Sequence, residues 1–444
     1  MALKLNHPFI HRRRGKSLGV FELIAIALGG MVGGGIFTVL GVSVSLIGAY
    51  TPIAIAIGGI IATFAAYSYI KLGVYYKDEG ATYSFYKKTF ENSHFAASLI
   101  GWWVIFGYIS TLALYAYTFA SYAISDFSFA NNEWVRKAVA GGIILLFTLV
   151  NVWSVKGMGR IEDLMVYTKL VLLSIISFVL INHTDTTLPH LLHETKDISF
   201  LSILIVASLT FVAYEGFQLV INAVNEMEKP EINIPKAIYW AIFLAITIYV
   251  VISLGAILAI PFEDIIRDKE YALASGTSHL LGHWGEDLVI TGALLATSSA
   301  ISSTLFGASR QMAVISKDGY FPSFLSKRDT TIPTNAIITM STLAFLLILA
   351  GNLELILEFG SVTFLIVSFL MAYANFKIRR KTNSSTFITL FAMFSLLVGS
   401  VFIIYFEATT QIEQLYFIIG LYMLLTLSAY LYSLFRARSL KNPF

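Results

Sequence analysis

Residues 29–37 read GGMVGGGIF and interrupt the first long apolar run of this 444-residue chain. A second long apolar run is interrupted at residues 211–217, which read FVAYEGF and place Glu215 among apolar neighbours. Glycine lets a backbone unwind and approach another group closely, and a carboxylate at bilayer depth is kept mainly for function. Irregular backbone inside a membrane survives only where protein or a water-filled cavity surrounds it. The two interruptions therefore predict a pair of broken membrane helices that meet at a binding site.

The composition is that of an integral membrane protein. Hydrophobic residues make up 57% of the chain and charged residues only 13%, whereas soluble domains carry about 25% charged residues. The net charge of +3 gives no indication of nucleic-acid binding. The histidines lack the spacing of zinc ligands, and no nucleophile–histidine–acid pattern, HExxH or P-loop is present. The sequence therefore predicts no nucleic-acid partner, no metal, no cofactor and no enzymatic activity.

Apolar segments predict twelve transmembrane helices, and hence an all-α integral membrane protein. The first six cover residues 20–42, 52–69, 96–124, 138–153, 164–181 and 200–225. The second six cover residues 237–260, 288–315, 336–350, 355–376, 387–406 and 415–434.

The lysines and arginines predict the orientation. With twelve spans, most of the 30 basic residues fall in loops on the same side as the two chain ends. The loops on the opposite side hold only Arg136, Lys137, Lys196, Arg267 and Lys269. Because basic loops stay in the cytoplasm, we expect both termini inside, in a multi-pass protein of the plasma membrane.

The two interruptions fall in the first and sixth predicted helices, five spans apart. This spacing predicts two five-helix repeats of inverted topology followed by two extra helices. The expected divisions are a tail at 1–17, a first repeat at 18–181, a second repeat at 197–377, the last two helices at 386–435, and a tail at 436–444.

Four groups of motifs resemble the amino acid–polyamine–organocation transporters, in particular the prokaryotic amino acid permeases. They are GGGIF at 33–37; EGATY at 79–83; YEGF at 214–217 with EKP at 228–230 and IPKAI at 234–238; and SR at 309–310 with KDGYFP at 317–322. The motifs occur in the family's order over about the first ten spans. The resemblance implies a leucine-transporter-like fold with helices 1 and 6 discontinuous, and transport of amino acids.

The resemblance also implies a substrate site at the breaks. The substrate carboxylate would lie on Met31, Gly34 and Gly35, and its ammonium would meet carbonyls near Val212, Ala213 and Glu215. Half-helix N-termini attract carboxylates because they carry partial positive charge. A competing interpretation of the glycines is close helix packing of the GxxxG kind. Three consecutive glycines, paired with the second break, favour the binding site.

Glu215 has three open roles. Many family members have an apolar residue at this position and an acid three residues later, where this chain has Gln218. Glu215 would pair with a cationic substrate, take part in proton coupling, or hydrogen-bond the unwound backbone, whose free groups need partners. Desolvation disfavours its charged form and makes protonation plausible.

Lys169 is the predicted coupling residue, because it lies deep in the fifth span and intramembrane ionisable groups are functional by default. By resemblance, its ammonium would replace a sodium ion and face the Gly29 carbonyl and hydroxyls of Ser298, Ser299 or Ser302. The alternative is a permanently charged lysine that locks two helices together.

The sequence thus predicts proton-coupled amino acid symport by alternating access. Exchange of amino acids or amines is the alternative, and a nutrient sensor that binds without transport ranks below both. The particular substrate and the oligomeric state are left open.

Overall fold

The computed structural model describes residues 18–125, 127–130, 132–153, 155–184, 187–188, 190–191, 198–268, 271–328 and 332–441. The predicted tail at 1–17 and the predicted start of the second repeat at 197 lie outside the described residues.

All the elements of the described chain are helices. The long and medium helices of the first half are α1 (Val20–Met31), α2 (Gly34–Ile47), α3 (Thr51–Tyr76), α4 (Ala81–Thr89), α5 (His94–Ala123), α6 (Glu133–Trp153), α7 (Val155–Asn182) and α9 (Phe200–Leu209). They are followed by α10 (Leu219–Asn222), α11 (Pro230–Ala259), α12 (Phe262–Asp268), α13 (Ala272–Leu281), α14 (His283–Lys317), α15 (Thr334–Ala350), α16 (Leu353–Lys377), α17 (Thr386–Thr410) and α18 (Ile412–Lys441). Three short 3₁₀ segments are η1 (Gly48–Tyr50), η2 (Thr210–Tyr214) and η4 (Ser323–Ser326).

Ten helical stretches of the described chain are long and apolar enough to cross a membrane, and α1 and α15 are shorter apolar helices. The all-helical, multi-pass membrane architecture predicted from the sequence is therefore confirmed. Many helices extend beyond the apolar runs that predicted them, as α14 does over 35 residues. Hydropathy marks the hydrocarbon region, whereas backbone hydrogen bonding continues into the polar interface.

Polar side chains cap several helices where the chain turns. Ser93, Asn352 and Ser385 each accept a hydrogen bond from the backbone N–H three residues further on, at 3.1, 2.9 and 3.4 Å respectively. These caps satisfy amide groups that have no partner within the helix. They explain why α5, α16 and α17 begin at His94, Leu353 and Thr386.

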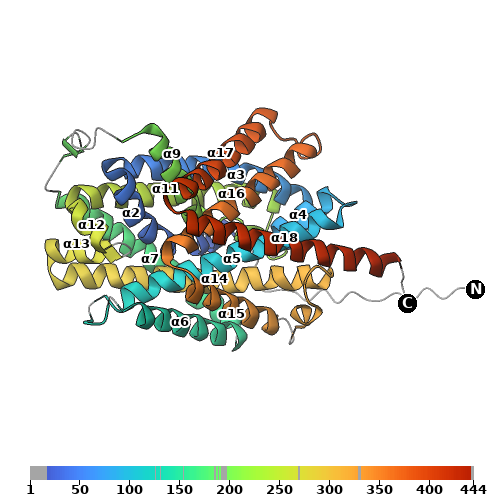
Figure 1. Cartoon of the computed structure of the whole chain (residues 1–444), viewed down its shortest axis with the longest axis horizontal. Coiled ribbons are helices and arrows are strands. Elements are labelled where there is room, and N and C mark those ends of the chain that lie inside the picture. The colour runs from blue at the N-terminus through green and yellow to red at the C-terminus, as the bar shows by residue number, and fades with distance from the viewer. Residues whose placement is uncertain are drawn as a thin grey trace, which may run out of the picture.

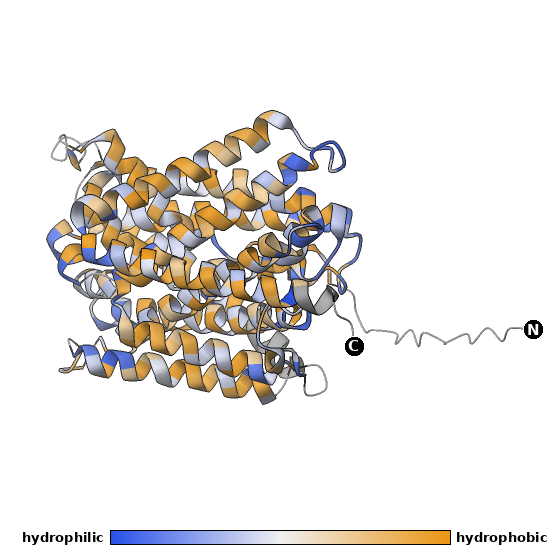
Figure 2. Cartoon of the chain, turned by 45° about the vertical axis from the view of Figure 1, so that its right-hand side comes forward, coloured by the Kyte–Doolittle hydropathy of each residue, from blue (hydrophilic) through white to orange (hydrophobic). Residues whose placement is uncertain are grey.

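The long helices run in a common direction across the molecule. Figure 1 shows α5, α14 and α18 lying roughly along the horizontal axis, with α4 towards one end and α12 and α13 at the other. Figure 2 shows hydrophobic residues over the bodies of the helices and hydrophilic residues gathered at the turns of both ends. This distribution is the one expected of a protein that crosses a bilayer along that axis.

The helices that contain the two interruptions lie at the centre of the bundle. The most extensive helix pairs are α5 with α14 and α3 with α11, and they surround the interrupted segments. Helix α1 packs against α11 and α14, while α2 packs against α5 and η2. A backbone hydrogen bond of 2.8 Å from the Leu18 N–H to the Glu226 carbonyl also joins the chain before α1 to the chain after α10.

Candidate functional site

The first break separates α1 from α2. Helix α1 ends at Met31, and α2 begins at Gly34 after a Gly33 that supplies no side-chain cap. Val32 (φ −84°, ψ 79°) and Gly33 (φ −124°, ψ −141°) are non-helical. The first amides of α2 therefore face the break, since the first N–H groups of a helix have no intrahelical partner.

The second break is longer and needs a glycine. Helix α9 gives way at Leu209 to η2, and residues 215–218 are non-helical before α10. Gly216 has φ +121°, a conformation that side chains rarely allow. Gly216 and Phe217 are therefore part of a turn rather than of a continuous helix.

The two breaks cross in direct backbone contact. A Cβ atom added to Gly216 would lie 2.5 Å from the Gly30 carbonyl carbon. A Cβ atom added to Gly35 would lie 2.9 Å from Ala213 Cα. Gly34 instead faces α5, where an added Cβ would lie 2.8 Å from the Thr118 hydroxyl. The glycines thus serve close packing, and the same packing brings the two breaks together.

Tyr249 of α11 links the breaks through its hydroxyl. This hydroxyl lies 2.7 Å from the Met31 carbonyl and 3.0 Å from the Ala213 carbonyl, and it can donate to one or the other. From α5, the Tyr115 hydroxyl donates to the Gly30 carbonyl at 2.9 Å. Sequence reasoning did not identify either tyrosine, because nothing local distinguishes them among the 23 tyrosines of the chain.

The predicted substrate residues lie at this crossing and are closed to solvent. Met31 is 0% exposed, Val212 and Ala213 are each 1% exposed, and Glu215 is 2% exposed. The Val212 carbonyl accepts a hydrogen bond from the Glu215 N–H at 3.1 Å. A carbonyl oxygen has two lone pairs, so such carbonyls keep capacity for a further donor.

Glu215 is held at the break by its neighbour Gln218. The Gln218 side-chain amide donates to Glu215 Oε2 at 2.5 Å and to the Tyr108 hydroxyl at 3.0 Å, while its oxygen accepts from the Gly216 N–H at 3.2 Å. Glu215 Oε1 has no hydrogen-bond partner among the described residues. The side chain therefore supports the turn with one oxygen and leaves the other available.

Lys169 of α7 contacts the first break with its amine. Lys169 is 0% exposed, and its Nζ lies 3.2 Å from the Gly29 carbonyl, 2.6 Å from the Val32 carbonyl and 2.6 Å from the Ser299 hydroxyl of α14. The Val32 carbonyl was not among the expected partners, because only the folded break turns it towards α7.

The two other serines named for this site differ from Ser299. The Ser302 hydroxyl is buried without a hydrogen-bond partner among the described residues, and Ser298 is half-buried. No group of three or more His, Cys, Asp or Glu side chains that could hold a metal was found within the described part of the chain.

The ten long apolar helical stretches of the described chain, together with the two crossed breaks, define a multi-pass integral membrane protein. The chain belongs to the amino acid permease family, whose sequence profile matches residues 18–434. This result confirms the resemblance to the amino acid–polyamine–organocation transporters, and it makes the protein a membrane transporter rather than an enzyme.

The chain resembles curated members over most of its length. It is 27% identical to an uncharacterized protein of Methanocaldococcus jannaschii, over 97% of this chain and 98% of the relative. It is 29% identical to the inner membrane transport protein YbaT of Escherichia coli, over 91% of this chain and 94% of the relative. The branched-chain amino acid permease BcaP of Bacillus subtilis is 24% identical, over 70% of this chain and 69% of the relative.

Proposed function

We propose that this protein is a secondary active transporter that moves amino acids across the cell membrane by alternating access, coupled to the inward movement of protons. The observation that carries the proposal is the position of Lys169, which is fully buried with its Nζ 2.6 Å from both the Val32 carbonyl and the Ser299 hydroxyl. A cation at this place ties α7 and α14 to the first break.

The helix contacts support the leucine-transporter-like fold. Counting α1 with α2 as the first span, α3 and α11 are spans two and seven, while α5 and α14 are spans three and eight. These are the most extensive pairs of the bundle, and each joins equivalent members of two five-span repeats. An inverted repeat with its breaks in spans one and six produces this pairing.

The substrate site is assigned to the crossing of the breaks. The α2 N-terminus presents the amides of Gly34 and Gly35 to a carboxylate, because half-helix N-termini favour anions. On the other side, the Ala213 carbonyl and the unpartnered Glu215 Oε1 are acceptors for an ammonium. An α-amino acid carries both groups a few bonds apart, which matches this arrangement.

Proton coupling follows from the number of hydrogens on the Lys169 amine. A charged ammonium offers three donors, and three oxygens of Gly29, Val32 and Ser299 lie within 3.2 Å of Nζ. A neutral amine offers one donor fewer, so deprotonation weakens the connection of α7 to α1 and α14. The proton therefore biases the equilibrium between two arrangements of these helices.

We infer from the basic loops that both chain ends lie in the cytoplasm of a plasma-membrane protein. In this orientation α4 lies on the inside, and α12 and α13 lie on the outside. The substrate and the proton enter from the side of α12 and α13 and leave on the side of α4.

The test is uptake into proteoliposomes with an imposed inward proton gradient and no sodium. Labelled alanine, leucine, arginine and putrescine are compared in wild type, Lys169→Ala and the control Lys381→Ala, whose exposed lysine lies in the turn between α16 and α17. We expect gradient-driven accumulation in wild type and in the control, and its loss in Lys169→Ala. Uptake only into preloaded vesicles would instead establish an exchanger, and binding without uptake would establish a sensor.

A further inference from the structure

Two carboxyl groups are buried together at the interface of α16 and α17, away from the crossed breaks. Glu358 of α16 is 3% exposed and Glu407, in the last turns of α17, is 1% exposed. The two side chains interact directly across the extensive contact between these helices. This pair plays no part in the site described above.

The carboxyl oxygens lack the partners that buried carboxylates need. Glu358 Oε2 and both oxygens of Glu407 have no hydrogen-bond partner within the described part of the chain. None of the ion pairs found among those residues involves Glu358 or Glu407. Unpaired charges are costly to bury, so two adjacent carboxylates would not be stable at this interface.

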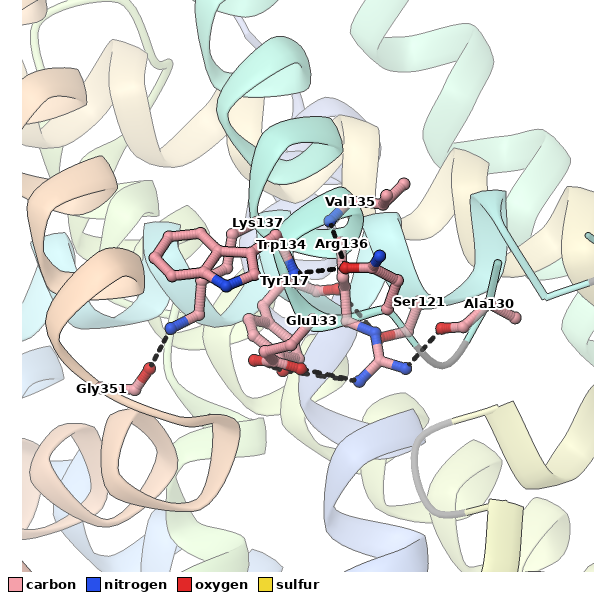
Figure 3. Close-up of polar contacts among 10 residues, drawn as sticks. Tyr117, Ser121, Ala130, Glu133, Trp134, Val135, Arg136, Lys137 and Gly351 are labelled. Carbon is pink, nitrogen blue, oxygen red and sulfur yellow. Dashed lines mark hydrogen bonds and ion pairs between the residues drawn. The ribbon is translucent and has the colours of Figure 1, made fainter. Parts of the chain in front are cut away.

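Lys137 and Arg136, two cations of the described chain at this end of the molecule, are bound to other groups. The Lys137 amine lies 3.3 Å from the Leu349 carbonyl and 3.4 Å from the Gly351 carbonyl, in the turn before α16, and Figure 3 shows it reaching Gly351. Arg136 lies 3.5 Å from Glu133 and donates to the Ala130 carbonyl at 2.9 Å (Figure 3).

The other described groups around the pair are acidic or neutral. Glu354, one turn before Glu358, adds a like charge that acts on both carboxyls. Gln411, one turn after Glu407, donates to Glu354 at 3.5 Å and is bonded to Gln414 of α18. Glu413 of α18 is exposed. The packed helices α9 and α15 and residues 51–66 of α3 carry no titratable side chain.

The tyrosines of α5, α18 and η2 that could approach have other partners. Hydroxyl contacts join Tyr108 to Gln218, Tyr115 to Gly30, Tyr117 to Glu133, Tyr214 to Ile55 and Tyr422 to Thr363.

We propose that Glu358 and Glu407 form a proton-binding site, in which the two carboxyl groups share one proton across the α16–α17 interface. A shared proton removes one of two adjacent charges and supplies the missing donor, as an O–H···O⁻ hydrogen bond. Loss of the proton leaves two like charges in contact and drives the helices apart. Helix α16 also packs on η2 and on α9, and its Ser361 hydroxyl lies 2.9 Å from the carbonyl of Leu209, the last residue of α9, and 2.8 Å from the Leu357 carbonyl, so that it can donate to one or the other. Through this contact the site connects proton binding to the second break.

The first experiment detects the proton itself by infrared spectroscopy of the purified full-length protein. Protonated carboxyl groups have a carbonyl stretching band that carboxylates lack. We expect the double variant Glu358→Gln/Glu407→Gln to lose the intensity of one protonated carboxyl relative to wild type. The control Glu413→Gln, at an exposed position in α18, keeps that intensity. An unchanged band in the double variant would overturn the proposal.

The second experiment measures the midpoint of thermal unfolding between about pH 6 and about pH 9, a range below the titration of ordinary lysines. We expect wild type and Glu413→Gln to lose stability as the pH rises, because the shared proton is lost. Glu407→Gln keeps a donor to Glu358 at every pH and should have a flatter profile. Identical profiles for wild type and Glu407→Gln would contradict the proposal. Restoration of wild-type stability at high pH by sodium or calcium, together with an unchanged infrared band, would assign the pair to a cation instead.

Discussion

Gly216 lies against Gly30 so closely that a Cβ on Gly216 would be 2.5 Å from the Gly30 carbonyl carbon. This contact joins the second break to the first, and it combines a steric requirement with the positive φ of Gly216. The positions of the amides, carbonyls and Glu215 around the crossing all depend on it.

Gly216→Ala should therefore disrupt the site. The methyl group meets backbone rather than a flexible side chain, and the positive φ alone costs on the order of 1–3 kcal/mol. We expect a lower thermal unfolding midpoint and loss of substrate binding, measured on the purified protein. The matched control is Gly142→Ala in α6, where an added Cβ meets nothing within 4 Å. Equal effects of the two substitutions would show that the crossing is not sterically constrained.

Tyr249→Phe should weaken binding while leaving the fold intact. The substitution removes the hydroxyl that lies 2.7 Å from the Met31 carbonyl and 3.0 Å from the Ala213 carbonyl, but keeps the ring that packs on Tyr214. A buried hydrogen bond contributes about 1 kcal/mol, so we expect roughly a five- to tenfold rise in the substrate dissociation constant, measured by equilibrium binding. Tyr416→Phe, at a tyrosine that is 67% exposed, serves as the control. Wild-type affinity in Tyr249→Phe would show that the Tyr249 hydroxyl does not contribute to substrate binding.

Ser299→Ala should alter the pH dependence of uptake. Its hydroxyl accepts from the Lys169 ammonium at 2.6 Å, and an acceptor stabilises the charged form of an amine. Without it, the ammonium has one acceptor fewer, so the pH of half-maximal proton-driven uptake should shift. Ser302→Ala is the matched control on the same helix, because the Ser302 hydroxyl has no hydrogen-bond partner among the described residues. A shift of the same size in both variants would argue against a direct role of Ser299.

Asp318→Asn should loosen α4 from the end of α14. Asp318 accepts from the Tyr83 hydroxyl at 2.8 Å and pairs with Lys87 at 2.7 Å. Burial and the neighbouring Asp318 hold the pKa of Tyr83 well above its usual range, so the phenol remains a donor and its contribution is complete below about pH 10. We expect a loss of about 1–2 kcal/mol, since the pair with Lys87 is partly exposed.

This loss would be measured as a lower unfolding midpoint at neutral pH. Asp287→Asn, at an exposed position near the other end of α14, should have little effect. An unchanged midpoint in Asp318→Asn would show that α4 is held by its apolar contacts alone.

Local sequence was sufficient to predict the membrane class, the long apolar helices, the two breaks and the buried lysine. Each of these features differs from its immediate neighbours in the sequence. The apolar runs alternate with charged loops, the glycines interrupt an apolar helix, and Lys169 is a charged residue within an apolar span. Hydropathy decides whether a segment enters the membrane, and glycine decides whether its helix can be interrupted. Both effects depend on a few neighbouring residues, so they can be predicted from local sequence. The ends of the helices were less predictable, because hydrogen bonding continues past the apolar region.

Only the tertiary structure decided which groups meet. Tyr249 reaches two breaks from a third helix, Val32 turns its carbonyl to Lys169, and Glu358 finds Glu407 on the neighbouring helix. In the sequence these are an ordinary tyrosine, a valine and two glutamates near predicted span ends. Their roles depend on which residues, far apart in the chain, lie close together after folding. Because these groups are buried, they must form hydrogen bonds or share protons with one another instead of with water.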